Sequence, residues 1–356
     1  MTRNNKAVIR VIGVGGAGCN AVSRMVEEGM QGVEFFVANT DIQSLESSPV
    51  NNKIVLGPDL TGGLGAGGSP DFGKRAAEES EDDLRAIVKG ADMIFVTAGM
   101  GGGTGTGAAP LVAKIAQEEG ALVVGIVTKP FLFEGPGRGR NAASGLDELK
   151  KHVDSLIIIS NNQLLEVIGN IPFLEAFLEA DNVLRQGVQT ITDLIAVPAL
   201  INLDFADVKS IMKQQGAALI GIGMAEGENK AVKAAESSIT SPLLEAKIQG
   251  AKKAIINVTG GETMNIMDAS AAVDYIRDAA GFDMEIIFGV AINDNIGDAI
   301  IVTLIATGFE DDAEEHEVRN KFNKDFKMKS HTTPNINKEV EPEEDPSGIP
   351  DFFRRN

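Results

Sequence analysis

The stretch Gly99-Met100-Gly101-Gly102-Gly103-Thr104-Gly105-Thr106-Gly107, here called the central glycine loop, decides how the rest of the chain is interpreted. It follows an apolar run at 93–98 and precedes a helical pattern at 108–116, so we expect a strand, a loop and a helix in succession. Because six of its nine residues are glycine, backbone N–H groups can approach a ligand closely. With the dipole of the following helix and two threonine hydroxyls, this arrangement is typical of a phosphate site. A flexible turn is the alternative, but linkers rarely lie between a buried strand and a helix.

A second glycine-rich segment, the first glycine loop (13–20), lies near the N-terminus. It follows a strand expected at 7–13, and Gly13, Gly15 and Gly18 have the G-x-G-x-x-G spacing of dinucleotide-binding loops. Asp41 follows the next expected strand, near the position of a ribose-binding acid. This pattern favours an oxidoreductase with a nicotinamide cofactor, although the motif is weak when taken alone.

A third glycine loop (61–70) precedes a helix expected at 71–89, and further strands are expected at 121–127 and 155–159. The alternation of strands and helices predicts an α/β, Rossmann-like parallel sheet with helices on both faces. Ligands bind at the carboxyl ends of such strands, so the three loops are expected at one edge. Three phosphate-type loops exceed what a pyrophosphate needs, and a nucleoside triphosphate uses them more naturally.

The second half of the chain has a different pattern. A helical pattern from 172 to 197 predicts a long central helix, and the mixed strands and helices beyond it predict a smaller α+β domain with a mixed sheet. From Glu310 onward, charged residues, Pro and Asn replace the apolar periodicity, which predicts disorder. The expected organisation is a nucleotide-binding domain (1–171), a central helix (172–199), a C-terminal α+β domain (200–309), a disordered linker (310–347) and a terminal peptide (348–356).

Composition excludes several classes of function. The net charge of −19 argues against a nucleic-acid-binding protein, which needs clustered Lys and Arg. The single cysteine, Cys19, excludes an intrachain disulfide and a cysteine-rich metal site. Without an apolar run of eighteen residues, we expect a cytoplasmic protein that does not insert into a membrane.

The chain resembles the FtsZ family of bacterial cell-division GTPases, in the tubulin superfamily, over essentially its whole length. Six segments carry the resemblance in the order expected for that family: 15–21 in the first glycine loop, 102–107 in the central glycine loop, 128–138 on the ribose side, 180–186 at the start of the central helix, 202–207 after that helix, and 348–356 at the end. The resemblance implies that the protein binds GTP and GDP with Mg²⁺, hydrolyses GTP, and polymerises head to tail into filaments of the cell-division (Z) ring.

The resemblance also implies roles for individual residues. Glu134 and Arg138 are expected on the ribose side. Asn161 and Asp181 are expected to recognise guanine, whose ring N–H and exocyclic amine require an acceptor. By its position alone, Asp181 is an acid stabilised by a helix dipole. The residues expected around the phosphates are Gly15, Gly16, Ala17, Gly18, Cys19, Asn20, Gly102, Gly103, Thr104, Gly105, Thr106 and Gly107.

The resemblance also bears on the metal ion and on Cys19. Mg²⁺ is expected to be held mainly by nucleotide oxygens, because the histidines and the cysteine suggest no metal site. Cys19 lies near a helix start, where a thiol can have a lowered pKa, but a small residue tolerated in a tight loop is the simpler interpretation.

The phosphate loops contain no His or carboxylate that could activate water. Asp204 and Asp207 share a face if they begin a helix, for which Asn202 is a plausible cap. By spacing alone, they are an ordinary acidic helix start. The resemblance implies instead that this loop enters the nucleotide site of the next subunit, where the acids position the attacking water.

The terminal segment and the third glycine loop carry further expectations. The resemblance implies that 348–356 docks on membrane-tethering division adaptors, at mid-cell. Gly62, Gly68 and Ser69 depart from the family pattern in the third glycine loop, which leaves its nucleotide-dependent switch open. The other two hypotheses are a nicotinamide oxidoreductase and a GTP-binding scaffold without turnover.

Overall fold

The computed structural model describes residues 7–169, 171–196, 199–240, 248–261, 263–281 and 283–309. These residues belong to one compact unit. The expected linker (310–347) and terminal peptide (348–356) lie outside the described residues, and the expected domain boundaries stay predictions. Within the described part, no helix is both long and apolar enough to cross a membrane.

The first half of the chain alternates strands and helices, as the sequence predicts. Strands β3-β2-β1-β4-β5-β6 lie side by side in this order, and all five pairings are parallel. The elements are β1 (Ile9–Val14), α1 (Gly15–Glu27), β2 (Glu34–Asn39), α2 (Ile42–Glu46), β3 (Asn52–Val55), α3 (Pro58–Thr61), α4 (Pro70–Glu79), α5 (Glu81–Val88), β4 (Met93–Gly99), α6 (Thr104–Glu118), β5 (Leu122–Lys129), η1 (Leu132–Glu134), α7 (Pro136–Leu149), β6 (Ser155–Ser160) and α8 (Asn161–Ile168).

The second half forms a mixed sheet, which confirms the predicted fold class. Strand β10 pairs antiparallel with both β7 and β8, and β8 pairs parallel with β9. Two parallel pairs, Ser155 with Gly216 and Leu156 with Ala217, join β7 to β6. The elements are α9 (Phe173–Ala196), α10 (Phe205–Met212), β7 (Gly216–Ala225), α11 (Lys230–Ile239), β8 (Lys253–Gly260), α12 (Ile266–Ala280), β9 (Glu285–Ile292), η2 (Asp294–Ile296) and β10 (Ile300–Thr307).

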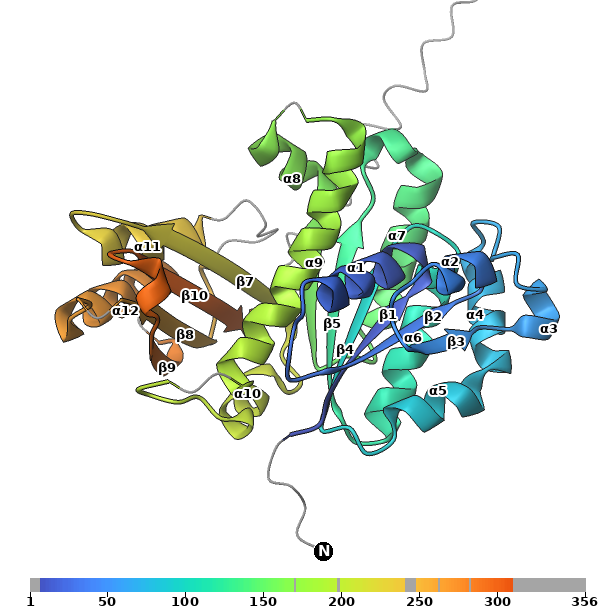
Figure 1. Ribbon diagram of the computed structural model, residues 1–356, viewed down its shortest axis with the longest axis horizontal. Coiled ribbons are helices and arrows are strands. Elements are labelled where there is room, and N and C mark those ends of the chain that lie inside the picture. Colours follow the sequence, from blue (N-terminus) through green and yellow to red (C-terminus); the bar gives the residue numbers. More distant parts are fainter. Residues whose placement is uncertain are drawn as a thin grey trace, which may run out of the picture. The chain divides into compact units, whose positions relative to one another are not determined.

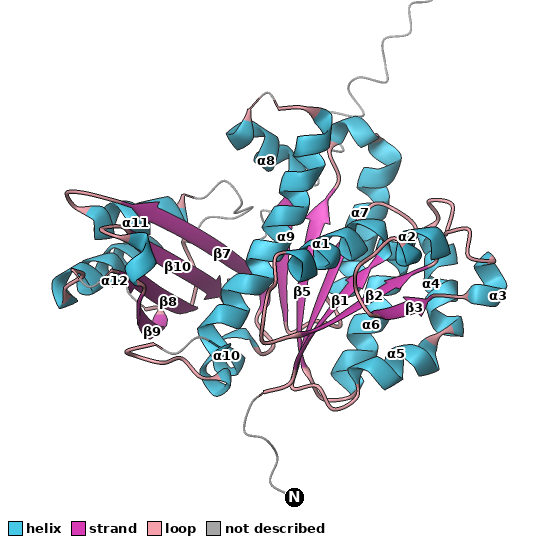
Figure 2. Cartoon of the chain, viewed as in Figure 1, coloured by secondary structure: helices cyan, strands magenta, loops and turns pink. Residues whose placement is uncertain are grey.

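Helices cover both faces of the parallel sheet, as Figure 2 shows. Successive residues of a strand point to opposite faces, and Val11 and Ile12 of β1 accordingly join two different cores. The core around Val11 contains residues of α1, α9 and α10, whereas the core around Ile12 contains residues of α4, α5, α6 and α7. Because both faces are buried, β4 and β5 are almost continuously apolar.

Helix α9 packs against both halves of the chain. Its buried residues Val188 and Ile191 lie in one apolar cluster with Ile126 of β5 and with Ile255 and Ile305 of the mixed sheet. Figure 1 shows α9 running between α8 at its upper end and α10 at its lower end. The single long helix expected from the sequence is therefore present, and it shares one core with both sheets.

Three helix boundaries differ from those expected. Helix α6 begins at Thr104 and α1 at Gly15, so both include residues expected in loops. Each glycine in a helix costs only about 1 kcal/mol, which tertiary packing can offset. The helix expected at 71–89 is divided at Ser80, whose Oγ accepts from the Gly57 N–H (3.0 Å) and donates to the Val55 carbonyl (3.2 Å).

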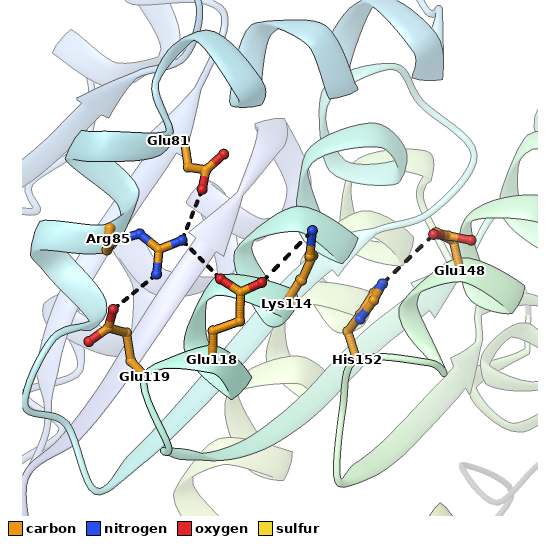
Figure 3. Close-up of polar contacts among 7 residues, drawn as sticks. All are labelled: Glu81, Arg85, Lys114, Glu118, Glu119, Glu148 and His152. Atoms are coloured by element: carbon orange, nitrogen blue, oxygen red, sulfur yellow. Dashed lines mark hydrogen bonds and ion pairs between the residues drawn. The ribbon is translucent and has the colours of Figure 1, made fainter.

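A network of ion pairs fastens the end of α6 to α5 (Figure 3). Arg85 of α5 lies 2.9 Å from Glu81, 2.9 Å from Glu118 and 3.0 Å from Glu119. Its hydrogen bond holds the pKa of Glu118 below the usual range. Exposed pairs of this kind contribute little stability individually. The network nevertheless joins α5 to the helix that begins in the central glycine loop.

Candidate functional site

The first and central glycine loops contact each other through their backbones. A Cβ atom on Gly15, whose φ is +72°, would lie 2.7 Å from the Gly105 nitrogen. A Cβ on Gly105 would in turn lie 2.7 Å from the Gly99 carbonyl oxygen, and one on Gly18 would lie 2.3 Å from the Thr97 carbonyl oxygen. Only glycine fits these positions, because any side chain would separate the loops after β1 and β4.

Two other glycines in the same loops face open space. A Cβ on Gly16 or on Gly102 would meet no atom within 4 Å. Helices α1 and α6 start at these loops, and neither start has a side-chain cap or an acid in its first turn. Their first N–H groups therefore lack the usual intrahelical or side-chain acceptors. Space beside two uncapped helix starts fits phosphate groups.

The two threonines of the central glycine loop bond within the protein. The Thr104 hydroxyl lies 2.6 Å from the Thr40 hydroxyl, and the Thr106 hydroxyl accepts from the Gly101 N–H at 2.8 Å. Thr104 and Thr106 are both buried. Their hydroxyls thus hold the shape of the loop, and direct contact with a phosphate stays a prediction.

The third glycine loop lies against the central one. A Cβ on Gly103 would be 2.9 Å from the Ser69 nitrogen, and one on Gly107 would be 2.0 Å from the Pro70 carbonyl oxygen. Ser69 caps α4 by accepting from the Phe72 N–H at 3.4 Å. All three loops therefore meet at the carboxyl edge of the parallel sheet, as expected.

The residues expected on the ribose side lie next to the central glycine loop. Arg138 of α7 forms an ion pair with Glu134 of η1. The other Glu134 oxygen accepts from the Phe131 N–H at 2.9 Å. A Cβ on Gly101 would be 2.9 Å from the Arg138 carbonyl oxygen, which places the start of α7 against the loop.

Two polar side chains expected to recognise the base have unusual environments. Asp181 of α9 is largely buried, and this burial raises the pKa of its carboxyl group to about 6, although nearby Arg24 opposes the shift. Asn161 follows the carboxyl end of β6, and its buried Oδ1 has no hydrogen-bond partner among the described residues. Unpartnered buried acceptors are costly, so a ligand that donates N–H groups fits this position.

The acids expected to be catalytic form a capping box at the start of α10. Asp204 Oδ1 accepts from the Asp207 N–H at 2.9 Å, and Asp207 Oδ2 accepts from the Asp204 N–H at 3.0 Å. The helix cap is thus Asp204, and the expectation that Asn202 caps it is wrong. Asn202 lies two residues before this cap, and its side chain accepts instead from the Ala199 N–H. Asp204 is the residue whose side chain reaches the N–H of the third helical residue, Asp207.

This capping box lies at the opposite edge of the sheet from the glycine loops. The Ser155 hydroxyl, at the start of β6, donates to the Met212 carbonyl at the end of α10 (2.6 Å). The glycine loops follow the carboxyl ends of β1 and β4, and a six-residue strand such as β6 spans about 20 Å. Figure 1 shows α10 at the far end of α9 from α8.

Two residues singled out in the sequence have structural roles. Burial raises the pKa of the Cys19 thiol to about 12, and the side chain is 1% exposed, so it is not a reactive thiolate. Asp41, considered for a nicotinamide ribose, caps α2 by accepting from Gln43 and Ser44 N–H groups at 3.0 and 3.3 Å. The described residues contain no cluster of three or more His, Cys, Asp or Glu side chains suited to a metal.

Sequence reasoning missed three polar residues near the site. Arg24 lies 3.6 Å from Asp181, Thr40 contacts Thr104, and the Asn141 side chain lies 3.4 Å from the Gly101 carbonyl. Thr40 had a detectable signal, since it follows the carboxyl end of β2. Arg24 and Asn141 are ordinary polar residues on helices, and only the fold reveals their neighbours.

A parallel sheet with three glycine loops at its carboxyl edge, joined through α9 to a mixed sheet, defines a nucleotide-binding protein of the tubulin-like GTPase class. The sequence matches the Tubulin/FtsZ family, GTPase domain, over residues 8–169, and the FtsZ family, C-terminal domain, over residues 216–310. The chain belongs to the Tubulin/FtsZ family and is a GTPase.

Solved structures agree with this assignment. An empty FtsZ dimer from M. jannaschii is 43% identical, with a TM-score of 0.80, over 86% of this chain and 89% of that one. An FtsZ point mutant from M. jannaschii is also 43% identical, with a TM-score of 0.81, over 86% and 92%. CetZ2 from Haloferax volcanii, described as a GTPγS-bound protofilament, shares the fold at 22% identity and a TM-score of 0.76, over 91% and 99%.

Proposed function

We propose that this GTPase is a cytoskeletal cell-division protein that polymerises head to tail into filaments of a mid-cell ring. Its acids would act in the nucleotide site of the neighbouring subunit. Family membership supports the GTPase and filament parts of the proposal, and the M. jannaschii FtsZ dimer is an example of self-association in a relative. In each subunit, residues 1–171 would bind nucleotide, 172–199 form the central helix, and 200–309 carry the acids.

The separation of the two halves of the site carries this proposal. The glycine loops offer uncapped helix starts but no acid, and the acids of the α10 capping box lie at the other edge of the sheet. Asp204 and Asp207 therefore cannot reach the glycine loops of their own chain. A head-to-tail contact between identical subunits brings one edge to the other and repeats indefinitely.

Exposed apolar side chains support a contact at both edges. The nucleotide-edge patch consists of Leu64, Leu132, Phe133 and Leu174. The acid-edge patch consists of Leu200, Ile201, Ile266, Met267 and Ile292. Exposed apolar side chains at both edges suit a heterologous contact, in which two different surfaces meet, better than a two-fold dimer, in which one surface meets itself.

Each part of the assembled site would have a defined task. Backbone amides from 15–20 and 102–107 would hold the phosphates, and Glu134 with Arg138 would hold the ribose side. Asn161 and Asp181 would accept the N–H groups of guanine. Mg²⁺, held mainly by phosphate oxygens, would supply charge stabilisation when bound.

The neighbour's acids would position the attacking water. Each carboxylate uses one oxygen in the capping box, so the other oxygen of Asp204 and of Asp207 can accept from water. Asn202 would steady the loop that carries them, because it bonds the Ala199 N–H.

A mixing experiment tests whether the acids of one subunit act in the nucleotide site of the next subunit. Gly16→Val fills the phosphate space, and Asp207→Ala removes an acid, so each variant alone should hydrolyse GTP very slowly. In a 1:1 mixture, about a quarter of head-to-tail contacts should pair an intact pocket with intact acids, which should restore phosphate release. If the mixture stays as inactive as its components although both variants co-sediment, the proposal that the neighbouring subunit provides the acids is wrong.

The terminal segment has a separate test. We propose that 310–347 is a linker and that 348–356, with Phe352 and Phe353 beside Arg354, docks on a membrane-tethered adaptor in the cytoplasm. Deleting 348–356 should spare GTP-dependent light scattering and abolish adaptor co-sedimentation. Loss of polymerisation would contradict this role.

A further inference from the structure

The side chain of Arg24 belongs neither to the proposed phosphate site nor to the acids of the α10 capping box. It extends from the third turn of α1, and its Nε lies 3.6 Å from Oδ2 of Asp181 on α9. Figure 1 shows α1 lying beside α9. Arg24 follows Gly18 by six residues, or about 9 Å along the helix axis. One helix therefore begins at the phosphate space and ends beside the carboxylate proposed to accept from guanine.

The Asp181 carboxylate needs a charged neighbour. Asp181 is 14% exposed, and burial disfavours its ionised form, as its raised pKa shows. An acceptor of two N–H groups must nevertheless be ionised, because a protonated carboxyl group presents one oxygen as a donor. The cationic Arg24 favours the ionised form and orients one of its oxygens.

Three other charged side chains near this point of α1 and α9 have partners other than Asp181. Arg185 pairs with Glu28 at 3.0 Å and bonds Asn182 Oδ1, and Glu179 accepts from Asn182. Within the described residues, the charge that acts on Asp181 is that of Arg24. The pair Glu28–Arg185 thus links the same two helices without touching Asp181, and provides a matched control.

We propose that Arg24 is a positioning residue for guanine recognition: it holds the Asp181 carboxylate ionised and oriented toward the base. This inference rests on the proposed role of Asp181. Arg24 itself need not touch the nucleotide. Its effect is therefore expected to disappear when Asp181 is removed, and to be smallest at a pH where Asp181 ionises unaided.

The test is equilibrium binding of GDP and of IDP, which lacks the exocyclic amine, to the full chain at pH 6 and pH 8. Arg24→Gln should raise the pKa of Asp181 by about one unit, which weakens GDP binding about fivefold at pH 6 and less than about twofold at pH 8. Arg24→Lys, which keeps the charge, should bind like the wild type. Glu28→Gln should show no pH-dependent loss.

A double-mutant cycle separates this inference from the proposed function. Asp181→Ala should abolish the preference for GDP over IDP, and adding Arg24→Gln to it should change nothing further. If Asp181→Ala leaves that preference intact, the proposed recognition of guanine is wrong. If Asp181→Ala abolishes it but Arg24→Gln has equal effects at both pH values, or none, then only the role of Arg24 is overturned.

Discussion

Two helix starts at the nucleotide edge, those of α1 and α6, differ from the start of α10 at the acid edge. Helices α1 and α6 begin without a side-chain cap, whereas α10 begins with the reciprocal capping box of Asp204 and Asp207. An uncapped start leaves N–H groups and a positive dipole end available to an anion. A capped start satisfies its own N–H groups and displays carboxylates. The same secondary structure thus leaves N–H groups available to an anion at one edge and displays carboxylates at the other.

This difference explains why neither edge by itself has all the groups that GTP hydrolysis would need. At the nucleotide edge, the glycine loops 13–20, 61–70 and 99–107 contain no His, Asp or Glu, so they suit phosphate but offer no group to activate water. The acid edge has the carboxylates, and the helix start that carries them satisfies its own N–H groups. Four changes test the contrast, in order of decreasing expected effect.

The largest effect is expected where a glycine is packed against backbone. In Gly107→Ala, the new Cβ would lie 2.0 Å from the Pro70 carbonyl oxygen and 2.6 Å from the Lys74 nitrogen. Overpacking of this kind costs about 1–3 kcal/mol or more, so urea unfolding should show a marked loss of stability. Gly139→Ala, where a Cβ meets nothing within 4 Å, is the control and should not destabilise the protein.

A glycine that faces the open space should affect binding instead. Gly16→Val places its Cβ where no protein atom lies within 4 Å, so the fold should persist while the phosphates are obstructed. We expect GTP affinity to fall by more than about 100-fold, measured by equilibrium binding, which corresponds to about 2.8 kcal/mol. Unchanged affinity would show that the phosphates do not occupy this space.

At the acid edge, we expect a substitution to change GTP turnover without changing GTP affinity. Asp207→Ala should lower GTP turnover by about 100-fold or more and change GTP affinity by less than about twofold. The substitution removes one of the two capping-box hydrogen bonds, the one from the Asp204 N–H to Asp207 Oδ2, which should cost about 1 kcal/mol in unfolding free energy, too little to explain the loss of turnover. If turnover survives at protein concentrations that support polymers, the assignment of the acids is incorrect.

The smallest effect concerns pH. The raised pKa of Asp181, about 6, means that its ionised form is lost as pH falls through that value. Since we propose that the ionised form accepts from guanine, affinity for GDP should be constant above about pH 7 and should fall by up to about tenfold per unit below pH 6. The phosphates also titrate, so Asp181→Asn gives the baseline. A wild-type profile parallel to that of Asp181→Asn would contradict the role of this carboxylate.

Much of the fold could be predicted from local pattern. The apolar strands, the glycine loops and the long helix are encoded by periodicity and by residues with special backbone freedom, and they appear where expected. Helix starts were less predictable. Thr104 and Gly15 begin helices although the glycines around them disfavour helix, because packing of the loops against each other outweighs propensity.

Side-chain partners were predicted least well. Asn202 was expected to cap a helix that Asp204 caps, and nothing in the spacing of Arg24 and Asp181, 157 positions apart, indicates that they meet. Cys19 could be a reactive thiol or a packed residue until its burial was known.

The sequence by itself determined the class of fold, the phosphate-type loops and the acids, because each depends on residue type and on neighbours nearby in the chain. Only the tertiary structure decided which glycines are packed and which are open, and which carboxylates are used as caps. It also decided that the loops and the acids lie at opposite edges. These features depend on contacts between segments far apart in sequence, and the order of parallel strands, not local propensity, sets those contacts.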